Sequence, residues 1–297
     1  MRGSLIAAGL MLLAGHGVAA SGFRGEIGGG YIDGSSGISG YQIPEPGEPG
    51  EPGEPGEPGG SPGLSEDYDG WQINGRLYLD TVDDAGGPAR LRPFLNRASH
   101  VGMGYRTLES DSGVDADSWR IDTRLIWNAW VAEAEFGQAD AGFQGVEADA
   151  DAWRAAVGYY VARGTQLRGA YETLDGDGGF DTSRYAVDVT HVQQLSNGMT
   201  WSVNALAALV DEDTAFGSDD GTDVELTLDW FFNDAFGIGT ALRFADRDDG
   251  ADADSWEIYG DYWVTEKISL RLAYYEQDVD DAGLENDAWT FDVIYRR

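Results

Sequence analysis

Apolar and polar side chains alternate one by one along most of this chain. In residues 119–127, for example, Trp119 and Ile121 alternate with Arg120. Successive side chains of a β-strand point to opposite faces of its sheet, so a period of two predicts strands with one apolar and one polar face. The pattern recurs about fourteen times between residues 23 and 295, in segments of about 9–13 residues. The chain is therefore predicted to be all-β.

The connections between these segments are predicted to be of two kinds. Short turns over about residues 127–129, 162–164, 196–198, 233–235 and 265–266 alternate with long acidic connections over residues 109–117, 140–151, 175–181, 211–223, 246–254 and 278–287. Short turns at one end and long loops at the other are typical of transmembrane β-barrels, whose strands need about 9–11 residues to cross a bilayer. Residues 82–93 are an exception, a longer connection where a short one is expected.

We therefore expect a transmembrane, antiparallel up-and-down β-barrel of about 14 strands, within a range of roughly 12–16. The alternative is a soluble β-sandwich or jelly roll with the apolar faces as its core. Residues 1–20 have the features of a cleaved secretory signal peptide: Arg2, an apolar run over residues 5–13, and small side chains before Ser21. Residues 21–297 would then form the barrel, with residues 33–68 as a long extracellular loop rich in Gly-Glu-Pro.

An Asp-small-Trp motif occurs five times, each time where a strand is expected to follow an acidic connection. Each Trp belongs to the apolar side of its strand, and amphipathic rings at strand ends are typical of the membrane–water interface. We expect these residues to form an aromatic girdle: Trp71, Trp119, Trp153, Trp256 and Trp289.

The charge of the chain excludes some functions and leaves others without support. With 19 Lys and Arg against 53 Asp and Glu, the net charge is −34, which repels nucleic acid. There is no cysteine, and His100 and His191 each stand alone, without a catalytic triad partner nearby. No zinc spacing, phosphate-binding loop or complete EF-hand is present, so we expect neither an enzyme nor a cofactor or specific metal site. Weak binding of divalent cations by the acidic connections stays open.

The polar side of the strands carries both signs of charge. Because the apolar side chains of a membrane barrel face lipid, the polar ones are expected to face the lumen and line a water-filled pore. The alternative is a set of ion pairs that stiffens a closed barrel. The residues expected in the lumen are Arg76, Arg120, Arg124, Glu133, Glu135, Arg154, Arg168, Arg184, Asp188, Asp229, Arg243, Asp261 and Arg271.

The two ends of the barrel region resemble those of Gram-negative outer-membrane porins. Residues 23–31, Phe-Arg-Gly-Glu-Ile-Gly-Gly-Gly-Tyr, resemble a porin's first strand, and the alternation from Trp289 to Tyr295 resembles its last. The whole architecture is similar to that of the monomeric fourteen-stranded porins. The family usually ends on an aromatic residue, whereas this chain ends Arg296-Arg297.

The resemblance implies contact with outer-membrane lipid and delivery by the barrel-assembly machinery through the C-terminal strand. It also implies passive diffusion of ions and small hydrophilic solutes, and the acidic loops favour a weak preference for cations. A surface receptor or adhesin that uses its acidic loops is the alternative function. The transported solute and the choice between monomer and trimer stay open.

Overall fold

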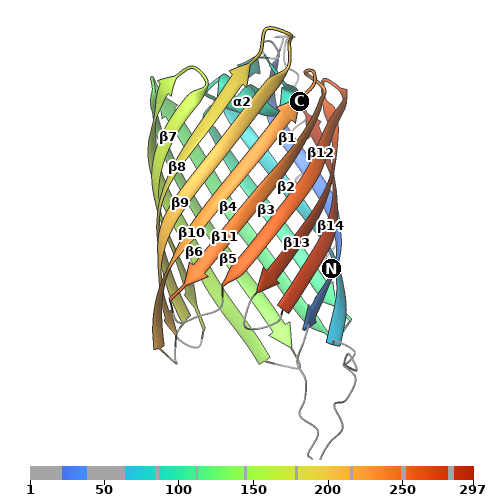
Figure 1. Cartoon of the computed structure of the whole chain (residues 1–297). Helices are drawn as coiled ribbons and strands as arrows, with labels where there is room; N and C mark the ends of the chain where they lie inside the picture. The colour runs from blue at the N-terminus through green and yellow to red at the C-terminus, as the bar shows by residue number, and fades with distance from the viewer. Residues whose placement is uncertain are drawn as a thin grey trace, which may run out of the picture.

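The computed structural model describes residues 22–38, 64–83, 87–111, 113–143, 146–177, 180–214, 217–248, 252–279 and 284–297. Fourteen strands form one closed antiparallel barrel, in which β1 pairs with β14 and every other strand with its sequence neighbours (Figure 1). They are β1 Gly22–Ile38, β2 Leu64–Asp83, β3 His100–Ser110, β4 Val114–Trp127, β5 Trp130–Phe143, β6 Val146–Ala162, β7 Thr165–Gly176, β8 Phe180–Gln194, β9 Thr200–Thr214, β10 Gly217–Phe231, β11 Phe236–Arg247, β12 Ala253–Thr265, β13 Ile268–Val279 and β14 Leu284–Arg296.

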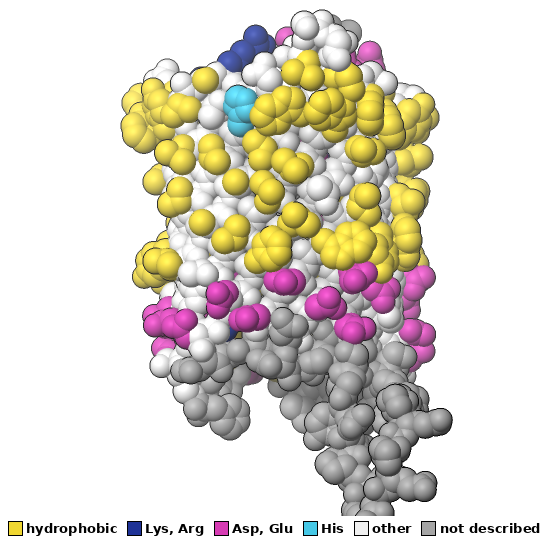
Figure 2. Space-filling view, in the orientation of Figure 1, with side chains coloured by type: hydrophobic (Ala, Val, Ile, Leu, Met, Phe, Trp, Pro, Cys, Tyr) yellow, Lys and Arg dark blue, Asp and Glu magenta, His cyan; other side chains and the backbone are white. Residues whose placement is uncertain are grey.

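The predicted fold class is confirmed, and the apolar side chains lie on the outside of the barrel. Val157 is 66% exposed, whereas Ala156 and Tyr160 on the opposite face of β6 are buried. Figure 2 shows the apolar side chains as a broad band around the visible face. A soluble sandwich would bury this set, so the arrangement is that of a barrel built for an apolar surrounding.

The acidic stretches that were predicted to be long loops lie mostly in strands, so that prediction is wrong. Residues 140–151, for example, belong to β5 up to Phe143 and to β6 from Val146 onward. The alternation continues at both ends of this stretch, with Ala139 and Ala150 on the inner face and Asp140 and Asp151 on the outer face. Their backbone groups pair across the ladder, as Ala139 opposite Ala150 shows. The predicted loop over residues 33–68 is also shorter, because β1 runs to Ile38 and β2 begins at Leu64.

One connection folds into the barrel. Between β2 and β3, the described residues 87–99 contain a 3-10 turn, η1 (Ala89–Leu91), and a short helix, α2 (Arg92–Leu95). We call residues 87–99 the inward turn. Figure 1 shows α2 at the same end of the barrel as the C-terminus. We call this the turn end and the opposite end the rim end.

The predicted signal peptide and the Gly-Glu-Pro run lie outside the described residues. Among the helices of the described chain, none is long and apolar enough to span a membrane.

Candidate functional site

Ion pairs join the charged side chains on the inner wall across several strands. Arg124 on β4 and Arg168 on β7 each lie 2.7 Å from a carboxylate oxygen of Glu133 on β5. The Nε of Arg168 also donates to both oxygens of Asp188 on β8, at 3.0 Å. The Asp188 side chain is only 1% exposed. An ionised carboxylate this deeply buried is stable only because it is paired and hydrogen-bonded.

A second series of ion pairs runs from β6 to β11. Arg154 lies 2.7 Å from Glu172 on β7, which lies 3.2 Å from Arg184 on β8. Arg184 continues to Glu225 on β10, at 2.8 Å. From β11, Arg247 lies 2.9 Å from Asp223 on β10. These pairs reach across neighbouring strands on the inner face, so most predicted lumen residues between β4 and β8 are brought together.

The remaining predicted residues fall into two groups. Three are paired: Arg271 lies 2.7 Å from Glu257, and Asp229 and Asp261 both meet the inward turn, as described below. The others make no ion pair with any residue that the structure describes: Arg76, Arg120, Glu135 and Arg243.

The inward turn crosses the interior from β2 and β3 to the opposite wall. Nη1 of Arg90 lies 3.2 Å from Asp229 on β10 and 2.6 Å from Asp261 on β12. The guanidinium also stacks on the ring of Tyr259, 4.7 Å from its centroid. The two carboxylates outweigh the cost of burial and keep Arg90 charged, and each charge-assisted contact is stronger than a neutral hydrogen bond. Apart from the length of the 82–93 connection, no residue pattern in the sequence indicates this contact.

Other contacts fasten the rest of the inward turn. Nη1 of Arg296 on β14 donates to the carbonyl of Ala89, at 2.8 Å. On the β6 side, the hydroxyl of Tyr160 donates to the carbonyl of Phe94, at 3.3 Å, and Arg97 stacks over the Tyr160 ring. The segment is therefore attached to β6, β10, β12 and β14, and it narrows the interior at the turn end.

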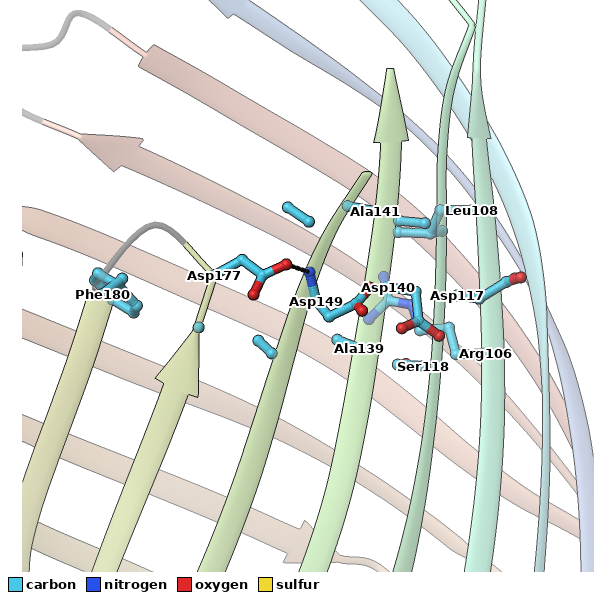
Figure 3. Close-up of a pocket in the computed structure, with 14 residues that line it drawn as sticks. Arg106, Leu108, Asp117, Ser118, Ala139, Asp140, Ala141, Asp149, Asp177 and Phe180 are labelled. Atoms are coloured by element: carbon cyan, nitrogen blue, oxygen red, sulfur yellow. Dashed lines mark hydrogen bonds between the residues drawn. The ribbon is translucent and has the colours of Figure 1, made fainter. Parts of the chain in front are cut away.

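The rim end of the wall is lined differently. A hollow of about 470 Å³ lies at the rim ends of β3 to β8 (Figure 3). Small or apolar side chains dominate its lining, among them Leu108, Ala116, Ala141 and Phe180, and Arg106 is its one basic residue. The charged interior described above thus gives way to a wall of mostly small side chains at the rim end, beside Asp117, Asp140, Asp149 and Asp177.

Carboxylates encircle the outside of the barrel near the rim end. Figure 2 shows them as a row beyond the apolar band. In register, Asp151 lies opposite Asp175 and Asp175 opposite Asp181. Every strand contributes to this acidic belt, which comprises Asp33, Asp69, Glu109, Asp117, Asp140, Asp151, Asp175, Asp181, Asp211, Asp220, Asp246, Asp254, Glu276 and Asp287.

Like charges placed directly opposite each other oppose strand pairing, so this belt belongs in water or among polar headgroups. Lost hydration and the neighbouring carboxylate of Asp149 raise the pKa of Asp140 in the belt. Within the described ranges, no three His, Asp or Glu side chains are grouped so that they could hold a metal ion.

The five predicted girdle residues follow the belt by two positions on the same face of their strands. Trp71, Trp153, Trp256 and Trp289 are exposed, and Trp119 is half-buried. The centroid of each ring lies 5.0–5.5 Å from that of an aromatic ring on a neighbouring strand. The partners are Tyr105, Phe136, Tyr171 and Tyr274, and Tyr274 contacts both Trp256 and Trp289. Such contacts favour a fixed ring orientation at the edge of the apolar band.

The structure is similar to solved outer-membrane channels. Outer membrane protein Omp33 of Acinetobacter baumannii aligns with a TM-score of 0.54 and 14% identity, over 94% of this chain and 100% of that chain. A FadL homologue of Pseudomonas aeruginosa aligns with a TM-score of 0.50 and 10% identity, over 92% and 90%. The TodX deltaS2S3 mutant monoaromatic hydrocarbon channel aligns with a TM-score of 0.50 and 12% identity, over 94% and 91%. No protein-family model and no curated protein sequence matches the chain. At these identities the likeness establishes the architecture: the chain has the fold of the outer-membrane β-barrel channels.

Proposed function

We propose that this protein is an outer-membrane porin through which ions and small hydrophilic solutes diffuse passively. The observation that carries the proposal is the division of one closed barrel into an apolar outer face and a charged inner face. A barrel of this size leaves more room inside than an eight-stranded one, whose side chains fill it. Ion-paired arginines and carboxylates on the wall would face water in such a pore.

The proposed orientation places the rim end outside the cell and the turn end in the periplasm. Both ends of the described chain support it, since the amide of Arg24 donates to the carbonyl of Arg297 at the turn end. In barrels with an even number of strands, the termini and the short turns lie in the periplasm. Residues 1–20 would direct secretion, and β14 would present the C-terminal strand to the barrel-assembly machinery. The apolar band and the girdle would contact lipid.

The distribution of charge supports a weak preference for cations. Inside, many arginines are offset by carboxylates in ion pairs, so the wall itself should discriminate little. Outside, the acidic belt surrounds the rim with carboxylates. A negative mouth raises the local concentration of cations and lowers that of anions.

The inward turn supports a second candidate, a surface receptor or adhesin. The contacts of Arg90 with Asp229 and Asp261 hold this segment across the interior, and a barrel closed at that level would not conduct. The acidic rim would then be the surface that meets a partner.

Swelling of liposomes that contain the refolded protein separates the two candidates. A porin should admit neutral arabinose rapidly and the trisaccharide raffinose much more slowly, because the inward turn narrows the passage. A barrel that stays folded by its gel mobility but admits neither sugar would contradict the porin proposal and favour the receptor.

A further inference from the structure

One part of the inner wall holds charges that have no partner. A hollow of about 320 Å³ is lined by Arg120 and Glu135, together with charged residues that are already engaged, among them Arg76, which interacts with the hydroxyl of Tyr78. Arg124 and Glu133 pair with each other there, and Asp122 lies 3.0 Å from the Nε2 of His100. Arg120 and Glu135, in contrast, make neither a hydrogen bond nor an ion pair with any residue that the structure describes.

The backbone places these two side chains close together and leaves space around them. Arg120 on β4 lies opposite Gly137 on β5, and Glu135 is two residues along β5 from that glycine. Such diagonal neighbours have Cα atoms about 7–8 Å apart. On the other side, Arg120 faces Gly104, where an added Cβ would stand 3.4 Å from the Nε of Arg120. Arg120 is exposed, and neither neighbouring strand places a side chain directly opposite it.

An unpaired guanidinium next to an unpaired carboxylate is complementary to one class of solute. A simple anion would satisfy Arg120 and leave Glu135 unpaired, and a simple cation would do the reverse. An acidic rim also repels anions before they reach this wall. A solute that carries both charges a few bonds apart satisfies both side chains and crosses the rim without net repulsion.

From this geometry we propose that the hollow is a binding site for zwitterionic amino-carboxylates, such as free amino acids and short peptides. Arg120 receives the carboxylate, and Glu135 receives the ammonium group. The Nδ1 of His100, which is buried without a hydrogen-bond partner among the described residues, provides one more polar contact at the same hollow. This inference rests on the proposed porin function, for which it names a solute class.

Saturation-transfer NMR titrations of the refolded protein in detergent micelles test the site without requiring conduction. The probes are L-alanine, propionate, which lacks the ammonium group, and ethylamine, which lacks the carboxylate. L-Alanine should bind at least tenfold more tightly than either. Arg120→Gln and Glu135→Gln should each weaken L-alanine binding at least tenfold, whereas Arg163→Gln, in an exposed turn, should leave it unchanged.

The inference is overturned if the three probes bind within twofold of one another, or if Arg120→Gln and Glu135→Gln bind L-alanine as the unaltered protein does. Neither result affects arabinose swelling, which tests the porin function separately. Selective L-alanine binding without arabinose entry would support the site and contradict the porin. Unchanged heat-dependent gel mobility of the two variants would show that they are folded; Arg120 lies near Asp122, but neither it nor Glu135 makes an ion pair or hydrogen bond with a described residue.

Discussion

The direction in which a side chain points decides what a charge costs at that position. Leu226 and Thr227 are adjacent on β10 but lie on opposite faces, because Leu226 shares its face with exposed Leu228 and Thr227 shares its face with Asp229. We predict that Leu226→Arg, and likewise Ala205→Arg on β9, destabilises the barrel by about 2–4 kcal/mol in a bilayer. Thr227→Arg is the matched control and should be tolerated. The folding yield of each variant in lipid vesicles, determined from gel mobility before and after heating, measures this destabilisation. Equal yields for Leu226→Arg and Thr227→Arg would mean that the assignment of faces is wrong.

Asp188 depends on Arg168 because it is buried. Removing Arg168 leaves an ionised carboxylate without the guanidinium whose Nε donates to both of its oxygens, so Arg168→Met should cost about 3–5 kcal/mol of unfolding free energy. Arg163→Met removes the same charge from an exposed turn and should change the free energy of unfolding by less than about 0.5 kcal/mol. Guanidinium titration of the refolded proteins gives both values. If both variants lost the same small amount of unfolding free energy, the ion pairs on the inner wall would not stabilise the barrel.

Single residues also show how far a sequence can be interpreted. The outward face of the five predicted girdle Trp residues follows from local spacing alone, since a period of two fixes the face of each side chain. That Arg124 and Arg168 would both meet Glu133 was not predictable, because it depends on which strands become neighbours and on the lengths of their side chains. That Arg120 and Glu135 would stay unpaired while their neighbours pair was equally beyond the sequence.

Among the elements, the inward turn is the one that we expect to limit flow, since it alone of the described connections crosses the interior. Replacing residues 88–97 with a short Gly-Ser linker should increase single-channel conductance severalfold, because the contacts of Arg90, Phe94 and Arg97 with the far wall disappear. Arg90→Gln should give a smaller increase, and Arg163→Gln at the same end should give none. An unchanged conductance in the linker variant would place the narrowest point elsewhere.

The two ends of the barrel can be assigned by surface labelling. An epitope inserted after Gly176, at the rim end of β7, should be accessible to antibody on intact cells. The same epitope at Asn197, in the turn between β8 and β9, should be accessible only after the outer membrane is permeabilised. The reverse pattern would invert the proposed orientation and remove the acidic rim from the cell surface.

The errors in the predicted elements have a physical cause. Residues 147–153 alternate strictly, but aspartate is disfavoured in strands and common in loops, so its density suggested a loop. In the barrel this stretch continues as β6, because alanine fits the crowded inner face and aspartate meets solvent outside. The inward turn could not be predicted, because Arg90 meets Asp229 across 139 positions of sequence.

At the scale of the whole molecule, the net charge of −34 is distributed unevenly. Arginines offset much of the negative charge inside, while the belt and the rim remain acidic. Exposed charge acts over a screening length of about 10 Å at 0.1 M salt and about 3 Å at 1 M. The preference for cations should therefore be measurable in dilute salt and fade as the salt concentration rises.

Single-channel recording of the refolded protein in a KCl gradient tests the central claim, that this barrel is a conducting porin with an acidic mouth. The result expected is a stable conductance whose reversal potential favours K⁺ near 0.1 M and approaches zero preference near 1 M. A constant preference for Cl⁻ at low salt would mean that the wall arginines, and not the rim, set the selectivity. Folded protein that inserts and shows no conductance would contradict the claim itself.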